Sequence, residues 1–249
     1  MPKGMAAIAG LILAVSLVLP AAAQTPAPDD VTGQTQRGRG KEARQAERAA
    51  TLFSEAATTY AEIVNLCLTD RAPAVRLAIA SARGELTRLQ PMLKEEALAA
   101  LQNNLASMET FEAAGNLTSI ALTASESFKT IVTAMNPQIR RTPIEVSLHT
   151  YQAFRLVTLA SAAEIDWPAV TQSAKESEKS WITLRRMVRD THLRVLLSEI
   201  QSGLRDAVSR NDAASVKFAA RLQVGSTAVL RDFFERFARS MARGTDLQR

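Results

Sequence analysis

Residues 70–92 read DRAPAVRLAIASARGELTRLQPM, and residues 166–187 read DWPAVTQSAKESEKSWITLRRM. In both stretches a proline closely follows an Asp, and apolar residues then recur at steps of three and four. This spacing predicts an amphipathic helix with the Asp as N-cap and the proline in its first turn. At an offset of 95 residues, Pro73-Ala74-Val75 falls on Pro168-Ala169-Val170. The chain therefore contains two similar helix starts.

The alignment extends beyond these two stretches. Further apolar positions coincide at the same offset, and after a slip of one residue the stretch Asn116–Ser119 falls on Asp212–Ser215. Because Asn and Asp are preferred N-caps, helix boundaries are matched as well as apolar spacing. The sequence therefore predicts two tandem copies of a roughly 95-residue, three-helix unit, in residues 42–136 and 142–243. We expect the two copies to pack as one elongated all-α helical bundle.

The composition of the 249 residues favours the same fold class. Hydrophobic residues make up 47% of the chain and aromatic residues only 5%, and there are ten Gly and nine Pro. Abundant Ala and Leu favour helices, whereas strands favour β-branched and aromatic residues. Pro91 is expected to interrupt the long helix of the first copy. Arg186 stands at the matching place in the second copy, which predicts an unbroken helix from about residue 168 to 209.

The N-terminus has the three parts of a secretory signal. A basic residue precedes a continuous apolar stretch of 14 residues, Ala6–Leu19, and small residues follow at Ala21–Ala23. This stretch is shorter than the roughly 20 residues that span a bilayer. We therefore expect a signal peptide in residues 1–23, cleaved near Ala23, and an exported mature protein with no transmembrane span. In a Gram-negative bacterium, its compartment is the periplasm.

Residues 24–41, QTPAPDDVTGQTQRGRGK, contain Pro, Gly and polar residues and almost nothing that could be buried. Such a composition is typical of flexible linkers. We therefore expect a disordered tether over these residues, followed by a first helix that begins near Glu42 and ends near Leu68.

The chain has one cysteine and two histidines, and this scarcity excludes many kinds of catalytic and metal centre. A single Cys cannot form a disulfide framework or a Cys-rich metal site, and no C-x-x-C-H motif for covalent haem occurs. No G-x-S-x-G, H-E-x-x-H or Gly-rich phosphate-binding motif is present. The sequence therefore indicates a protein that is not an enzyme. Cys67 lies on an apolar helix face, which favours a buried structural thiol over one that joins two subunits.

One set of residues keeps a metal site open as an alternative. Glu145 and His149 are four residues apart on one expected helix. His192 and Glu199 are seven residues apart on another, so each pair shares a helix face. If the two helices pack side by side, the four side chains could bind a transition metal or a non-covalent haem. Neither pair has the Glu-x-x-His spacing of di-iron bundles, and ordinary hydrogen bonding explains both histidines as well.

Aromatic residues of the second copy form another candidate site. Trp167 and Trp181 are 14 residues apart, close to four helical turns, so both should face one side of a helix. With three further aromatic residues they could line an apolar ligand pocket, whose candidate residues are Tyr151, Phe154, Trp167, Trp181 and Phe218. Ordinary core packing is the alternative explanation.

These features favour an exported, non-enzymatic helical-bundle protein that binds a partner protein or a small ligand and needs no cofactor. The formal net charge is +5, with both signs mixed along the chain, so nucleic acid is not an expected partner. Another envelope protein or a small ligand is the expected partner, and a homodimer stays open. A metal- or haem-binding bundle is the alternative function.

Overall fold

The computed structural model describes the backbone of residues 31–140 and 142–246, and the side chains of residues 42–140 and 142–238. This part of the chain is all-helical, as the sequence predicted, and contains no strand. The expected signal peptide and residues 24–30 of the expected tether lie outside it. Its elements are α1 (Val31–Leu68), α2 (Ala72–Leu89), η1 (Gln90–Met92), α3 (Glu95–Ala113), α4 (Leu117–Ala134), η2 (Pro137–Ile139), α5 (Ile144–Ser161), α6 (Trp167–Met187), α7 (Thr191–Ser209) and α8 (Ala213–Asp246).

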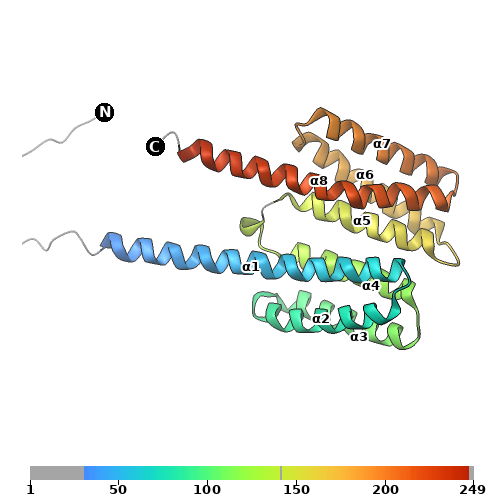
Figure 1. Ribbon diagram of the computed structural model, residues 1–249, viewed down its shortest axis with the longest axis horizontal. Coiled ribbons are helices and arrows are strands. Elements are labelled where there is room, and N and C mark those ends of the chain that lie inside the picture. The colour runs from blue at the N-terminus through green and yellow to red at the C-terminus, as the bar shows by residue number, and fades with distance from the viewer. Residues whose placement is uncertain (1–30, 141, 247–249) are drawn as a thin grey trace, which may run out of the picture. The chain divides into compact units, whose positions relative to one another are not determined.

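The chain divides into a unit of residues 1–42 and a unit of residues 43–249. Within the larger unit, α1–α4 lie together on one side and α5–α8 on the other (Figure 1). From α2 to α8 each α-helix packs against the next one along the chain, and α8 also packs against α5. The Thr59 hydroxyl of α1 donates to the Glu85 carboxylate of α2 at 2.7 Å. Among the described residues, no helix is both long and apolar enough to cross a membrane.

Three helices end on a residue in the left-handed region, with φ of 55° at Asp70, 70° at Gly115 and 52° at Asn211. The amide that follows each of them donates to the carbonyl oxygen five residues back, at 2.9–3.0 Å. This Schellman geometry satisfies carbonyl groups that a helix end leaves without partners. Asp70 therefore ends α1 and does not cap α2 as expected; Arg71 precedes α2 without a side-chain cap.

Side-chain caps open the helices of the second half. Asp166, Asp190 and Asp212 begin α6, α7 and α8, and each accepts a hydrogen bond from the amide three residues on, at 2.9–3.0 Å. Asn116 begins α4 in the same way, at 3.0 Å. The proposed caps at Asn116, Asp166 and Asp212 are confirmed.

The prediction of one unbroken helix over residues 168–209 is wrong. Helices α6 and α7 are separate because Asp190 accepts the amide of Leu193 and starts a new helix. Val188, between them, is extended and its side chain is buried. Each half of the larger unit thus contains four α-helices where the sequence predicted three.

Helix α1 begins at Val31, eleven residues before the expected start. The expected tether, residues 24–41, therefore overlaps helical backbone from residue 31 onward. Gln, Arg and Lys in this stretch have good helix propensity. A helix already formed beyond Glu42 gains one hydrogen bond for each residue that it adds, so it can extend through three glycines.

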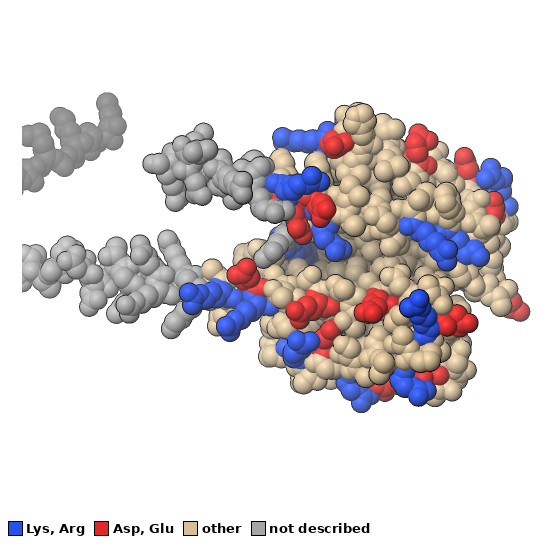
Figure 2. Space-filling view, in the orientation of Figure 1, with Lys and Arg blue, Asp and Glu red and all other residues tan. Residues whose placement is uncertain are grey.

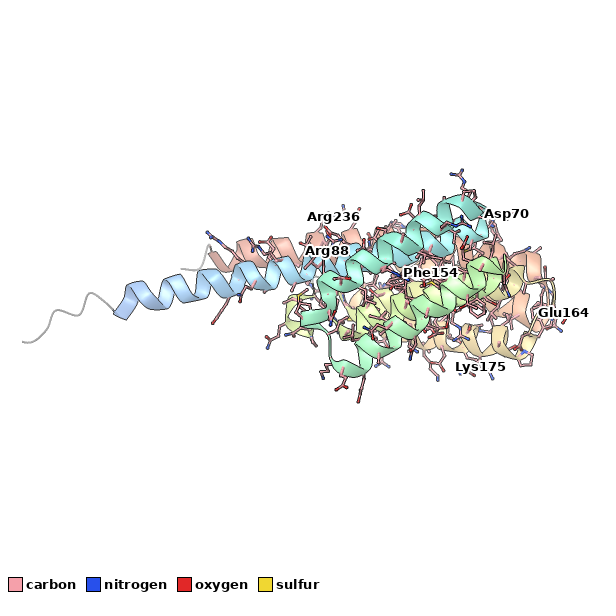
Figure 3. The ribbon with its side chains drawn as sticks, turned by 90° about the horizontal axis from the view of Figure 1, so that it is seen from below. Asp70, Arg88, Phe154, Glu164, Lys175 and Arg236 are labelled. Carbon is pink, nitrogen blue, oxygen red and sulfur yellow. The ribbon has the colours of Figure 1, made fainter. Side chains whose placement is uncertain are left out.

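Three clusters of buried apolar side chains form the core. The first joins α1–α4 and includes Tyr151 and Phe154 of α5. The second and third lie among α5–α8, one near each end of these helices. Helix α5 contributes to all three, and no residue from Ile144 to Ala160 is exposed. It is the central helix of the unit, and Phe154 lies in the interior (Figure 3).

Replacing Asp190 by Ala tests the break between α6 and α7. We expect the free energy of unfolding to fall by about 1 kcal/mol, because the amide of Leu193 loses its acceptor. Chemical denaturation gives this value. Asp232→Ala, at an exposed position inside α8, is the matched control and should cost less than about 0.5 kcal/mol. Equal losses in both variants would contradict the assignment of Asp190 as a cap.

Candidate functional site

A groove lies between helix α1, the α4–α5 connection, α5 and α8. Its volume is about 470 Å³, and all its lining residues fall between Ala50 and Glu235, within the larger unit. Small-molecule sites typically have about 300–1,000 Å³. Figure 2 shows a hollow between α8 and α1, with charged side chains of both signs around it. The groove is therefore large enough to hold a small ligand.

The floor of the groove is apolar. Phe128 of α4 and Phe154 of α5 meet edge to face, with ring centroids 5.6 Å apart. The other apolar lining residues come from all sides: Ala50, Ala57, Ala61, Val132, Met135, Ile139, Ile144 and Val224. An apolar ligand that covers this floor is removed from water, which is favourable by roughly 25 cal/mol per Å² of apolar area.

Hydroxyl groups line the walls. The residues that carry them are Thr51, Ser54, Thr58, Thr142, Ser147, Thr150 and Thr227. Several already donate to their own helix: Thr58 to the Ser54 carbonyl at 2.9 Å, and Thr150 to the Val146 carbonyl at 2.9 Å. A hydroxyl that donates in this way still has an oxygen that can accept a hydrogen bond. The lining of the groove therefore contains both apolar side chains and hydroxyl groups that can accept hydrogen bonds.

Arg140 lies at the end of the groove formed by the α4–α5 connection. Its Nη2 donates to the carbonyl oxygens of Val132, Thr133 and Met135 at 3.2, 3.1 and 2.7 Å. A cation at a helix C-terminus is favourable because it meets the negative end of the helix dipole and carbonyls without intrahelical partners. Its Nε is buried without a hydrogen-bond partner. Arg140 thus closes α4 and still has a donor unused.

A second arginine, Arg231, lines the groove from α8. Within the part of the chain that is described, it makes no hydrogen bond or ion pair. The carboxylates that line the groove are engaged: Glu55 lies 3.6 Å from Arg88, and Glu235 also has an interaction partner. Two carboxylates and two arginines therefore line the groove, and neither arginine has a carboxylate partner among the described residues.

A separate polar layer is buried among α5–α8, between the second and third apolar clusters. Gln223 lies at its centre and donates to the Ser177 hydroxyl and the His149 carbonyl, both at 2.8 Å. Gln201 donates to the side-chain oxygen of Gln223 at 3.1 Å. Buried amides that are hydrogen-bonded in this way fix how the helices align, because a shifted register would leave them unpaired.

His149 belongs to this layer, and its side chain has no exposed surface. Neither ring nitrogen has a hydrogen-bond partner, and the ring centroid lies 6.4 Å from that of Trp181. Burial lowers the pKa of His149 to about 4, and the nearby Ser177 backbone acts in the opposite direction. The imidazole is therefore neutral at pH 7, and protonating it would place an uncompensated charge in the core.

The four proposed metal ligands are not brought together. His149 is fully buried, whereas His192 and Glu199 are exposed on α7, and Glu145 is partly buried on α5. Across residues 42–140 and 142–238, no three His, Cys, Asp or Glu side chains form a group that could hold a metal ion. Helical spacing placed each pair on one face, but the two faces do not meet.

The five aromatic residues do not form one pocket either. Tyr151 and Phe154 belong to the first apolar cluster, Trp181 belongs to the third, and Trp167 packs against the second. Phe218 is 65% exposed on α8. Only Phe154 lines the groove. The Tyr151 hydroxyl instead donates to Glu126 at 2.6 Å, and Arg155 donates to both at 3.0 Å.

Sequence reasoning missed both arginines of the groove. The only local signal was the stretch Asn136–Pro143, where two prolines bracket a basic connection. Arg231 has no signal of its own, because only tertiary packing brings its helix opposite α1. Cys67 lies where the apolar pattern placed it: it is buried, and desolvation raises its pKa to about 12, so the thiol is a poor nucleophile at neutral pH.

Comparison of the chain with models of protein families finds no match, and comparison with the curated proteins and with solved structures yields no significant match.

The buried His149 makes stability depend on pH. Its pKa is lower in the folded chain than the ordinary 6.5, so the unfolded chain binds the proton first as the pH falls. We expect the free energy of unfolding to decrease between about pH 6.5 and pH 4, by about 3 kcal/mol from this group. Chemical denaturation at a series of pH values measures the slope.

Two variants separate this effect from that of other titrating groups. His149→Leu removes the buried imidazole and should flatten the slope between pH 6.5 and pH 4. His192→Gln alters the exposed histidine and should keep it. An unchanged slope in His149→Leu would show that the pH dependence arises elsewhere.

Proposed function

We propose that this protein is an exported, non-enzymatic binding protein that holds a small molecule in the groove between α1, α5 and α8. The observation that carries the proposal is the groove, which combines an apolar floor with hydroxyl-lined walls. Small-molecule sites characteristically pair an apolar lining with a few polar groups that orient the ligand.

The lining residues favour binding over catalysis. Among the described residues that form the groove there is no His or Cys, and both carboxylates are engaged with other groups. General acid–base or nucleophilic catalysis needs a titratable or activated group within hydrogen-bond reach of the substrate. Hydroxyls that donate to their own helix carbonyls do not meet this need.

Export is part of the proposal and rests on the sequence alone. The basic start, the 14-residue apolar stretch and Ala21–Ala23 support a cleaved signal peptide. Expression of the full chain in a Gram-negative host should deliver it to the periplasm, with a new N-terminus close to Gln24. Mass spectrometry of the recovered protein gives the cleavage site. A full-length chain retained in the cytoplasm would contradict export.

We further propose that the chain contains two tandem copies of one helical repeat. The positions of the helices support this: α2 and α6 begin 95 residues apart, and α3 and α7, like α4 and α8, begin 96 residues apart. Asn116 and Asp212 cap α4 and α8 through the same hydrogen bond. In such an arrangement, the groove lies between α1, the first helix of the first copy, and α5 and α8, the first and last helices of the second copy.

Blocking the groove tests the proposed function. The neutral dye N-phenyl-1-naphthylamine, which fluoresces in apolar surroundings, should bind with one-to-one stoichiometry. Thr58→Trp places a large ring at the groove wall and should abolish this fluorescence, because the ring occupies the volume that the dye needs. Fluorescence titration, with thermal unfolding to verify the fold, measures the effect.

Glu62→Trp is the matched control, because Glu62 is exposed on α1 one turn further on and does not line the groove. Its dye binding should equal that of the parent protein. A dye that binds Thr58→Trp as well as the parent occupies another surface, and the proposed function would then be wrong.

A further inference from the structure

The charges of the groove restrict the kind of ligand that it can hold. Two arginines line it without a carboxylate partner among the described residues, Arg140 from the α4–α5 connection and Arg231 from α8. Both carboxylates of the lining are engaged, Glu55 with Arg88. An apolar ligand that covered the arginines would bury charges without compensating them, which is unfavourable.

We propose that the groove binds a free anionic amphiphile, such as a medium-chain fatty acid, with its carboxylate at Arg140 and Arg231 and its chain along the apolar floor. The inference rests on the proposed function and assigns the class of ligand to the same site. An anion would supply a counter-charge for both arginines, neither of which has a carboxylate partner among the described residues. Hydrogen bonds to ionised groups are about twice as strong as neutral ones.

The geometry of Arg140 fits this role. Its Nη2 donates to two carbonyl oxygens of α4 and to that of Met135, which follows α4, at 2.7–3.2 Å, so the guanidinium is fixed before a ligand arrives. A fixed donor loses little side-chain entropy on binding. Arg231, by contrast, is exposed and lies at the wall, where it attracts an anion through a charge that salt screens.

The floor fits an alkyl chain better than a compact polar anion. Phe128, Phe154 and aliphatic side chains from α1, α4, α5 and α8 all contribute to it. A small inorganic anion would leave this apolar surface in contact with water, whereas a chain covers it. The groove's volume, about 470 Å³, accommodates a single chain and not a bilayer surface.

Three probes of equal chain length test the ligand class: dodecanoate, dodecanol and dodecyltrimethylammonium, each below its micellar concentration. Binding is measured by calorimetry and by displacement of N-phenyl-1-naphthylamine. We expect dodecanoate to bind about tenfold more tightly than dodecanol, and the cationic probe to bind most weakly. High salt should reduce the difference in binding affinity between dodecanoate and dodecanol, because salt screens the charges of the arginines.

Arg231→Gln should weaken dodecanoate binding about fivefold and leave dodecanol unchanged, because an exposed ion pair contributes modestly. Arg221→Gln, an exposed arginine of the same helix that does not line the groove, is the charge-matched control and should change neither. Arg140→Gln, whose fold is verified by thermal unfolding, should weaken dodecanoate binding by more than Arg231→Gln does.

The outcomes separate this inference from the proposed function. Equal binding of dodecanoate and dodecanol, both blocked by Thr58→Trp, would overturn the anionic class and leave the groove as the site. Dodecanoate binding that survives Thr58→Trp and Arg231→Gln would overturn both. Binding to anionic phosphatidylglycerol vesicles without binding of monomeric dodecanoate would show a membrane surface as the ligand and overturn the inference.

Discussion

Helix α5 has no exposed residue before Ser161, and the rest of the unit is arranged around it. From Ile144 to Ala160 no residue is exposed, so neighbours must pack against this helix on every side. Helices α4, α6 and α8 pack directly against α5, and the first apolar cluster brings in α1 as well. Breaking the cover on any side would expose apolar surface.

The two unusual features of the unit both lie on α5. On one side, His149 faces a layer of hydrogen-bonded amides and hydroxyls that separates two apolar clusters. On another side, α5 faces the groove and not a packed helix. The residues there include Ile144, Thr150 and Phe154. The polar layer fixes how α6, α7 and α8 align on α5, and this alignment in turn positions the α8 wall of the groove.

Local signals in the sequence predicted the helices well. Capping residues such as Asp166 and Asp212 indicate where helices begin. Their side-chain oxygens accept a hydrogen bond from a backbone amide that has no partner within the helix. The break before Thr191 has the same signal in Asp190, but no proline accompanies it. Sites that span several helices are harder to predict, because helical spacing shows which residues share one face but not which faces meet. His149 and His192 are the example, one buried and one exposed.

Methyl NMR shows whether a ligand binds in the groove on α5. Isoleucines sample the whole unit: Ile139 and Ile144 line the groove, Ile79 lies in the α1–α4 core, and Ile182 is exposed on α6. With their methyl groups labelled, titration with dodecanoate should shift the signals of Ile139 and Ile144 and leave those of Ile79 and Ile182 in place. Shifts at Ile182 with none at Ile139 and Ile144 would show that the ligand binds outside the groove.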